Sequence, residues 1–221
     1  MNRLKHLALG LAIAAMPSMA SAQVTIGDPG GDLIGYFGAG STHTYGQTVT
    51  APIGVSSITD FSFWLYPASI GSFNFNAYVF AWDQTNFRAT GGALYTSGLI
   101  NAPTSGGLTQ VNSGPINVAV TPGALYVLAF SFDGNTNSGT GYNPWGYNYG
   151  GSYSGGVGTW YNNNVIADLT SHTWDGSRNI GDFQFEANFA TVPEPSSMVL
   201  LGGGLAALLV AARRRRQRSV V

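Results

Sequence analysis

The sequence predicts an all-β protein whose body is an antiparallel β-sandwich. Between Ser41 and Phe189, apolar and polar residues alternate in short runs, which is the period of a strand with one buried face. Turn-forming clusters separate these runs at about 8–12 residues, a spacing typical of sandwiches. No part of this region has a convincing helical period. Aromatic residues make up 13% of the chain, so a core can form and a disordered chain is excluded.

The first elements follow from glycine content and side-chain alternation. Residues 23–40 are rich in glycine and contain an Asp-Pro-Gly-Gly-Asp turn, so they predict one short edge strand at most. Residues 61–66 predict a strand with Phe61, Phe63 and Leu65 on its buried face. The next strand has an apolar face formed by Phe73, Phe75, Ala77, Val79 and Ala81.

The later elements are separated by clear turns, the first of them at residues 83–86. Further strands are predicted, in order, around Leu94 and Tyr95 and at residues 109–112, 116–120, 125–132 and 183–189. Residues 125–132 are apolar on both faces, which predicts a central strand that is buried on both sides. Residues 183–189 alternate phenylalanine or alanine with polar residues and give the clearest strand of the chain.

The order of three runs indicates a sandwich type. Residues 80–83, 91–95 and 125–130 resemble the corresponding parts of jelly-roll domains, which are common in exported bacterial proteins. The resemblance extends over about Thr48 to Phe189 and rests on pattern rather than on a defining motif. It implies a jelly-roll-like sandwich as the fold of the body.

The N-terminal residues 1–22 have the features of a secretory signal peptide. Arg3 and Lys5 precede a short apolar run at residues 7–16, and Ala20-Ser21-Ala22 supplies an A-x-A cleavage pattern. We expect cleavage after Ala22, which makes Gln23 the new N-terminus. An uncleaved N-terminal anchor is the alternative.

The C-terminal residues 192–221 consist of three parts in a fixed order. Pro193 and Pro195 flank Glu194 and keep the chain extended, which suits recognition by a protease. The uncharged run at residues 198–212 would span roughly 22–26 Å as a helix, short but workable for a hydrocarbon core of about 30 Å. The basic block that follows would stay in the cytoplasm. This membrane stop signal comprises Arg213, Arg214, Arg215 and Arg216, with Arg218 close by.

This order resembles the PEP-CTERM sorting signal of Gram-negative bacteria, also described as an ice-binding-protein C-terminal domain. The resemblance implies that Val192, Pro193, Glu194 and Pro195 are recognised by a membrane-embedded cysteine protease, an exosortase. It also implies a precursor anchored in the inner membrane and a mature protein in the cell envelope or outside the cell. A plain C-terminal anchor is the alternative. Ice binding is not expected, because the chain has no regular array of T-x-T motifs.

The predicted organisation is therefore a signal peptide at 1–22, a β-sandwich at 23–191 and a sorting signal at 192–221. The body contains nine carboxylate side chains and only two basic side chains, Arg88 and Arg178, which gives it a net charge of −7. Such a charge argues against nucleic acid and against an anionic membrane surface as partners. The chain has no cysteine, so disulfides and thiolate sites are excluded.

The body offers weak signals for catalysis, and we expect no enzymatic activity. It has no G-x-S-x-G motif, and its two histidines, His43 and His172, are far apart in sequence. A secreted glycan-active hydrolase is an alternative, because Asp182 and Glu186 lie four residues apart and could form a carboxylate pair. Further candidates are Asp60 and Asp83, although aspartates beside strands are commonly turn residues.

The sequence predicts no cofactor, with a structural calcium ion as an alternative. Oxygen-bearing side chains alternate at residues 133–139 as in the start of an EF-hand loop. Two positions depart from that pattern. Ser138 replaces the glycine at position six, and Pro144 replaces the bidentate glutamate at position twelve. An ordinary Asn/Gly loop is therefore expected.

Residues 139–164 combine aromatic residues with glycine and asparagine. Aromatic faces stack on sugar rings and asparagine side chains bind hydroxyl groups, which predicts a surface for exopolysaccharide. The proposed glycan-binding residues are Tyr142, Trp145, Tyr147, Tyr149, Tyr153 and Trp160. The other interpretation is that these aromatics cover or fill the sandwich. We expect an exported, non-enzymatic envelope or extracellular-matrix protein with a structural or binding sandwich; the alternative is a carbohydrate-binding module with a defined ligand.

Overall fold

The computed structural model describes most of the body and short pieces of the tail. The described residues are 22–35, 37–38, 42–66, 74–101, 107–132, 144–163, 165–176, 181–192, 202–205 and 207–209. The chain divides into one compact unit at 23–192 and a second unit formed by 1–22 and 193–221. The predicted signal peptide before Ala22 and the calcium-like loop at 133–139 lie outside the described residues.

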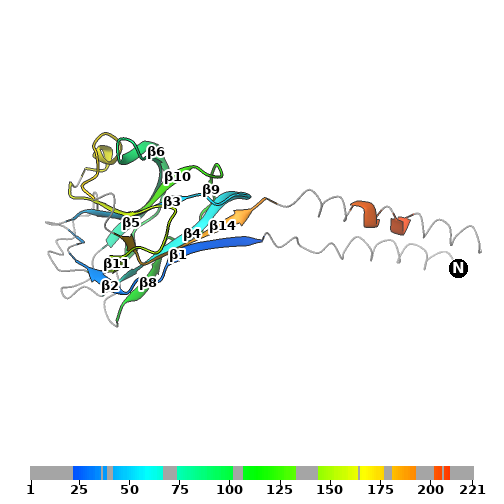
Figure 1. Ribbon diagram of the computed structural model, residues 1–221. Helices are drawn as coiled ribbons and strands as arrows, with labels where there is room; N and C mark the ends of the chain where they lie inside the picture. Colours follow the sequence, from blue (N-terminus) through cyan, green and yellow to red (C-terminus); the bar gives the residue numbers. More distant parts are fainter. Residues whose placement is uncertain are drawn as a thin grey trace, which may run out of the picture. The chain divides into compact units, whose positions relative to one another are not determined.

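The unit at 23–192 consists of two antiparallel sheets, which confirms the all-β prediction (Figure 1). The first sheet has the order β1 (Gln23–Asp28), β14 (Phe185–Thr191), β4 (Val55–Leu65), β11 (Trp145–Asn148) and β13 (Asp182–Phe183). Beside this path, β2 (Asp32–Ile34) pairs with β11, and β8 (Thr109–Asn112) and β9 (Val118–Ala119) pair with β4.

The second sheet has the order β12 (Gly158–Tyr161), β3 (Thr44–Thr50), β10 (Leu125–Ser131), β5 (Asn74–Asp83) and β6 (Arg88–Thr96). The short strand β7 (Ile100–Asn101) also pairs with β5. The strand predicted at 125–132 corresponds to β10 of this sheet, and the strand predicted at 109–112 corresponds to β8 of the first sheet. The jelly-roll connectivity stays a prediction.

An aromatic core joins the two sheets. Phe61 and Phe63 of β4 contact Phe130 of β10, with ring centroids 5.7 and 5.2 Å apart. Phe63 also packs against Trp145, whose ring centroid is 5.0 Å away. All four side chains are fully buried. The predicted inward face of residues 61–65 is therefore confirmed, and the sheets share one core, as in a sandwich.

A second apolar cluster covers the outer face of the second sheet. Val127 and Ala129 of β10 point into it, while Leu128 and Phe130 point into the main core, so β10 is buried on both sides as predicted. The segment around the 3₁₀ helix η1 (Ile166–Thr170) closes this cluster. Its other members include Tyr78, Phe80, Trp82, Phe87, Leu169 and Trp174.

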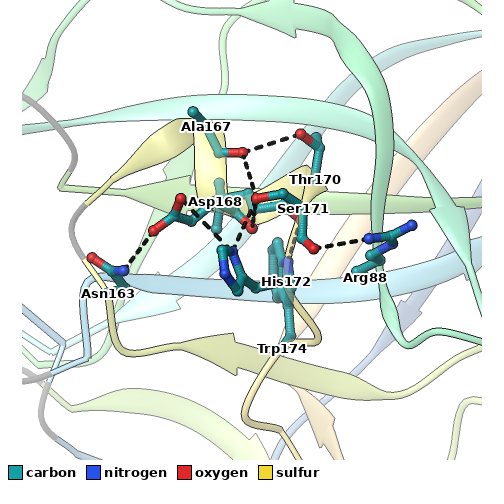
Figure 2. A network of polar contacts seen from close by, with 9 residues as sticks. Arg88, Asn163, Ala167, Asp168, Thr170, Ser171, His172 and Trp174 are labelled. Atoms are coloured by element: carbon teal, nitrogen blue, oxygen red, sulfur yellow. Dashed lines mark hydrogen bonds and ion pairs between the residues drawn. The ribbon is translucent and has the colours of Figure 1, made fainter.

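Polar contacts hold the η1 segment in place (Figure 2). Trp174 donates from its indole nitrogen to the Leu169 carbonyl at 2.8 Å. Arg88 of β6 donates to the Ser171 carbonyl at 2.8 Å. These bonds connect the segment to itself and to the edge strand of the second sheet, so the apolar cluster beneath stays covered.

The predicted turn at 83–86 is confirmed and has one unusual neighbour. The Asp83 carboxylate accepts bonds from the backbone amides of Thr85 and Asn86, both at 3.0 Å. Phe87 then takes a positive φ of 52°, which is rare for a bulky residue. Its ring is buried beside Trp82, with centroids 5.2 Å apart, so burial in the second cluster offsets the backbone strain.

Two sequence predictions need correction. Residues 23–40 form two strands, β1 and β2, rather than one at most. The glycines of this region indicated mostly loop, yet Val24 and Ile26 of β1 alternate toward the core. The last predicted strand is interrupted at Gln184, which separates β13 from β14.

The predicted membrane helix at 198–212 lies largely outside the described residues. Residues 202–205 and 207–209 are helical. Within the part of the tail and body that the structure describes, no helix is long and apolar enough to cross a bilayer.

The core predicts a large cost for truncating Phe63. Replacing Phe63 with Ala should lower the free energy of unfolding of residues 23–192 by about 3–5 kcal/mol, because four aromatic neighbours lose contacts and a cavity remains. Urea unfolding followed by tryptophan fluorescence measures this change. Leu99→Ala is the matched control, since Leu99 is 61% exposed and its truncation should change the stability by no more than about 0.5 kcal/mol. Equal effects of the two changes would contradict this packing.

Candidate functional site

The candidate site is the loop at residues 149–157, which connects β11 in the first sheet to β12 in the second. It is rich in glycine and serine, and it lies within residues 144–163, the described part of the aromatic stretch that the sequence singled out. Two buried aspartates, Asp28 and Asp182, hold it from below, each only 2% exposed. These two carboxylates fix the shape of the loop.

Asp28 stands at the end of β1 and binds the start of the loop. Its carboxylate accepts bonds from the Ser152 hydroxyl at 2.5 Å and the Ser152 amide at 3.0 Å. It also accepts bonds from the Gly30 amide at 2.8 Å and from the Asn148 side chain at 3.2 and 3.3 Å. Burial raises the pKa of Asp28, but the bonds from Ser152, Gly30 and Asn148 outweigh it and hold the pKa below its ordinary value.

Asp182 binds the next part of the loop and a side chain from the opposite sheet. It accepts a bond from the Tyr153 amide at 3.1 Å and one from the Gln47 side-chain nitrogen at 2.9 Å. Burial raises the pKa of Asp182, the bonds from Gln47 and Tyr153 oppose this effect, and the nearby charge of Asp28 reinforces it. The net result is a raised pKa. The pKa values of the two carboxylates, Asp28 and Asp182, are thus shifted in opposite directions.

Gln47 is a site residue that sequence reasoning missed. It lies in β3 of the second sheet and is fully buried. Its nitrogen donates to Asp182, and its oxygen accepts a bond from the Phe183 amide at 2.9 Å. Gln47 therefore links the two sheets through the core. Its one signal in the sequence is a polar residue between Tyr45 and Val49 on the apolar face of the strand.

Two glycines are required by close backbone approaches in this loop. Gly151 has a φ of 56°, and a Cβ there would lie 3.0 Å from an Asp182 oxygen. A Cβ on Gly156 would lie 1.8 Å from the Thr48 carbonyl oxygen, because the loop runs directly against β3. Side chains at either position would displace the loop.

The loop forms a pocket of about 290 Å³. The pocket is lined by Gly150, Gly151, Ser152, Tyr153, Ser154, Gly156, Val157, Gly181 and Asp182. A neighbouring hollow of about 280 Å³ shares Ser154, Gly156 and Val157 with this pocket and is also lined by Thr48 and Thr50. The first pocket is close to the lower size limit of small-ligand sites, about 300 Å³, so it suits a small ligand rather than a large cofactor.

The predicted aromatic residues occupy different environments. Trp145 and Tyr147 are fully buried in the main core, so they cannot present a face to a ligand, and this part of the predicted platform is wrong. Both lie on β11, whose pairing places them between the sheets. Tyr153 and Trp160 are half-buried against the core. Tyr149 is 57% exposed, whereas Tyr142 lies outside the described residues.

Of the carboxylates that sequence reasoning considered for hydrolysis, Asp60 and Glu186 share the side chain of Asn188, whereas Asp182 and Asp83 have other partners. Asp182 is buried beneath the loop, while Glu186 is half-exposed and accepts a bond from Asn188 at 3.3 Å. Asp60 lies within β4 and binds the side chains of Asn112 and Asn188 at 3.2 and 2.9 Å. Asp83 caps the turn described above. These contacts do not bring Asp182 and Glu186 to a common partner.

His172 belongs to a small polar group on the η1 segment (Figure 2). The Ser171 hydroxyl lies 2.9 Å from its Nδ1, and an Asp168 oxygen lies 3.7 Å from the same atom. In a Ser/His/Asp triad the serine and the carboxylate contact opposite ring nitrogens. Here both approach Nδ1, so this group does not have the triad arrangement. The other histidine, His43, precedes β3, and its carbonyl accepts a bond from the Phe132 amide at 2.9 Å.

Within the described ranges, no three His, Cys, Asp or Glu side chains are grouped so that they could hold a metal ion. The calcium-like loop at 133–139 lies outside these ranges. The structural calcium alternative therefore stays an untested prediction.

The contacts of Asp28 predict a pH-dependent contribution to stability. Asp28→Ala should lower the free energy of unfolding of residues 23–192 by about 1–3 kcal/mol at neutral pH, because amide donors lose their acceptor. A lowered pKa means that this stabilisation is present above the ordinary value of 3.8 and is lost as the pH falls through the folded-state pKa. The gap between wild type and variant should therefore narrow in acid, as urea unfolding at several pH values would measure.

Asp32→Ala is the control for this experiment. Asp32 is exposed and accepts one long bond, from the Tyr149 amide at 3.5 Å, so its removal should change stability by no more than about 0.5 kcal/mol. A gap between wild type and Asp28→Ala that stays constant into acid would contradict the charged role of Asp28.

Comparison with known proteins identifies the C-terminal part of the chain. Residues 191–216 match the model of the PEP-CTERM protein-sorting motif. A comparison with curated proteins found no match. The predicted recognition residues Pro193–Pro195 and the block Arg213–Arg216 lie outside the described residues, while Val192 ends the body. The chain therefore carries a PEP-CTERM protein-sorting motif directly after its β-rich body, as the sequence predicted, and this motif implies export, a membrane-anchored precursor and processing by an exosortase.

Proposed function

We propose that this protein is a non-enzymatic component of the cell envelope or extracellular matrix whose sandwich binds neutral sugar units of exopolysaccharide at the 149–157 loop. The observation that carries the proposal is the exposed ring of Tyr149, which directly precedes the first residue lining the loop pocket. Aromatic faces of this kind stack on sugar rings.

The ring of Tyr149 is supported from below. It packs edge-to-face on the buried ring of Tyr147, with centroids 4.9 Å apart and an interplanar angle of 72°. Tyr147 in turn packs against Phe183 of the core. A ring held in this way loses less conformational freedom when it binds a ligand, which favours binding by a shallow site.

The polar groups of the pocket suit hydroxyl-rich ligands. Ser152, Ser154 and several glycines place hydroxyl and backbone groups along the pocket wall. The net charge of −7 on the body disfavours acidic polysaccharides. Neutral sugars are therefore the class of ligand that we propose.

The same contacts support a binding role over a hydrolytic one. Both oxygens of Asp182 accept hydrogen bonds from the protein, from Gln47 and Tyr153. The oxygens of Asp28 are occupied in the same way by Ser152, Gly30 and Asn148. We therefore propose that these carboxylates shape the loop, and that a glycan-active hydrolase is the weaker alternative.

Substitution of Tyr149 tests the proposal. Tyr149→Ala should weaken binding of a neutral polysaccharide by about three- to tenfold, the loss expected when one aromatic stacking contact is removed. Affinity electrophoresis of residues 23–192 in gels with neutral or acidic polysaccharides measures the change. Tyr66→Ala is the matched control, because Tyr66 is 43% exposed and lies outside the loop. The proposed site would be refuted if Tyr149→Ala were retarded by neutral polysaccharide as strongly as the wild type. It would also be refuted if no neutral polysaccharide retarded the wild type.

A further inference from the structure

The first and last residues of the sandwich lie at the same end of the first sheet. β1 and β14 are antiparallel neighbours, and Gln23 pairs with Ala190. Figure 1 shows the start of β1 and the end of β14 side by side. The Val192 amide donates to the Gly54 carbonyl at 2.9 Å, which extends the pairing of this chain end with the turn before β4. The first and last residues of the body, which follow the signal peptide and precede most of the sorting signal in sequence, are therefore at the same end of the sheet.

Beside the start of β1, three further segments lie at this end, and we call these three segments the chain-end tip. They are residues 51–54, 120–124 and 190–192. Backbone bonds join them: Ala51 donates to the Ala124 carbonyl at 2.9 Å, and Gly123 donates to the Ala51 carbonyl at 2.8 Å. The tip is therefore a connected surface rather than a set of separate loops.

The composition of the tip differs from that of the rest of the body. None of its residues is charged, although the body carries a net charge of −7. Ile53 is 84% exposed and Val192 is 54% exposed, so two branched apolar side chains face outward. At the other end of β1, by contrast, Asp28 and Asp182 lie beneath the 149–157 loop.

The chain leaves the tip without a spacer. The sorting motif begins at residue 191, which is still in β14. Only residues 193–197 separate the body from the uncharged run that starts at Met198, and five extended residues reach at most about 17 Å. In an anchored precursor, the tip cannot move far from the bilayer surface.

We propose that in the membrane-anchored precursor the chain-end tip rests on the bilayer, with Ile53 and Val192 at the boundary between lipid headgroups and acyl chains. This proposal depends on the anchored precursor that the sorting motif implies, and not on sugar binding. The net charge of −7 on the body disfavours an anionic surface, but the tip itself has no charged side chain, so no carboxylate of the tip is repelled by anionic lipids. Exposed apolar side chains at a bilayer gain from leaving water.

A single labelled cysteine tests the contact. The chain has no cysteine, so Ile53→Cys gives one site for an environment-sensitive nitrobenzoxadiazole label. The full precursor carrying this label is reconstituted in vesicles of phosphatidylethanolamine and phosphatidylglycerol. Leu33→Cys is the matched control, because Leu33 is 43% exposed and lies in β2, which follows the opposite end of β1. Both positions are exposed, so neither label should disturb folding.

The label at position 53 should emit at shorter wavelength than the label at position 33 and should react several-fold more slowly with aqueous dithionite. Binding of polysaccharide by the labelled precursor should be unchanged, which separates this test from that of the loop. Emission and dithionite rates that are equal at the two positions would overturn the proposal. Protection of position 53 that requires an added exosortase would also overturn it, since the tip would then dock on protein rather than on lipid.

Discussion

The pairing of β14 with two neighbours is the constraint on which the rest of the structure depends. β14 binds β1 on one side, from Gln23–Ala190 to Asp28–Phe185, and β4 on the other. Its inward side chains, Phe185, Ala187 and Phe189, are buried in the main core. Because the strand before the sorting motif lies inside the first sheet, the sandwich cannot close until residue 191 has joined it. The last residues of β14 therefore complete the first sheet and also begin the sorting motif.

A second constraint lies within the core, where Gln47 connects the sheets. A buried polar side chain is costly unless its hydrogen-bonding groups are satisfied. Gln47 is bonded to Asp182 and to the Phe183 amide, and Asp182 passes the connection on to the Tyr153 amide of the loop. One chain of contacts thus sets the position of β13 against β3 and the shape of the pocket wall.

Much of the sandwich was predictable because its signals are local. The strands at 109–112 and 125–132 and the inward face of 61–65 follow from alternation and nearby turns, and the sorting motif follows from the order of its parts. β1 and β11 were obscured by glycine and asparagine, whose presence usually indicates a loop. Gln47, Trp145 and Tyr147 could not be placed, since their burial depends on pairing between residues far apart in sequence. Of the predicted glycan surface, the structure supports an exposed position for Tyr149 in particular.

The processing that the sorting motif implies is tested most directly by the mature C-terminus. Intact-mass and peptide mass spectrometry of the protein isolated from its own cells would measure it. A terminus between residues 193 and 197, next to the last bond between Val192 and Gly54, is the predicted result. Recovery from membranes of a chain that still contains Arg218 would contradict processing and would leave a permanently anchored protein.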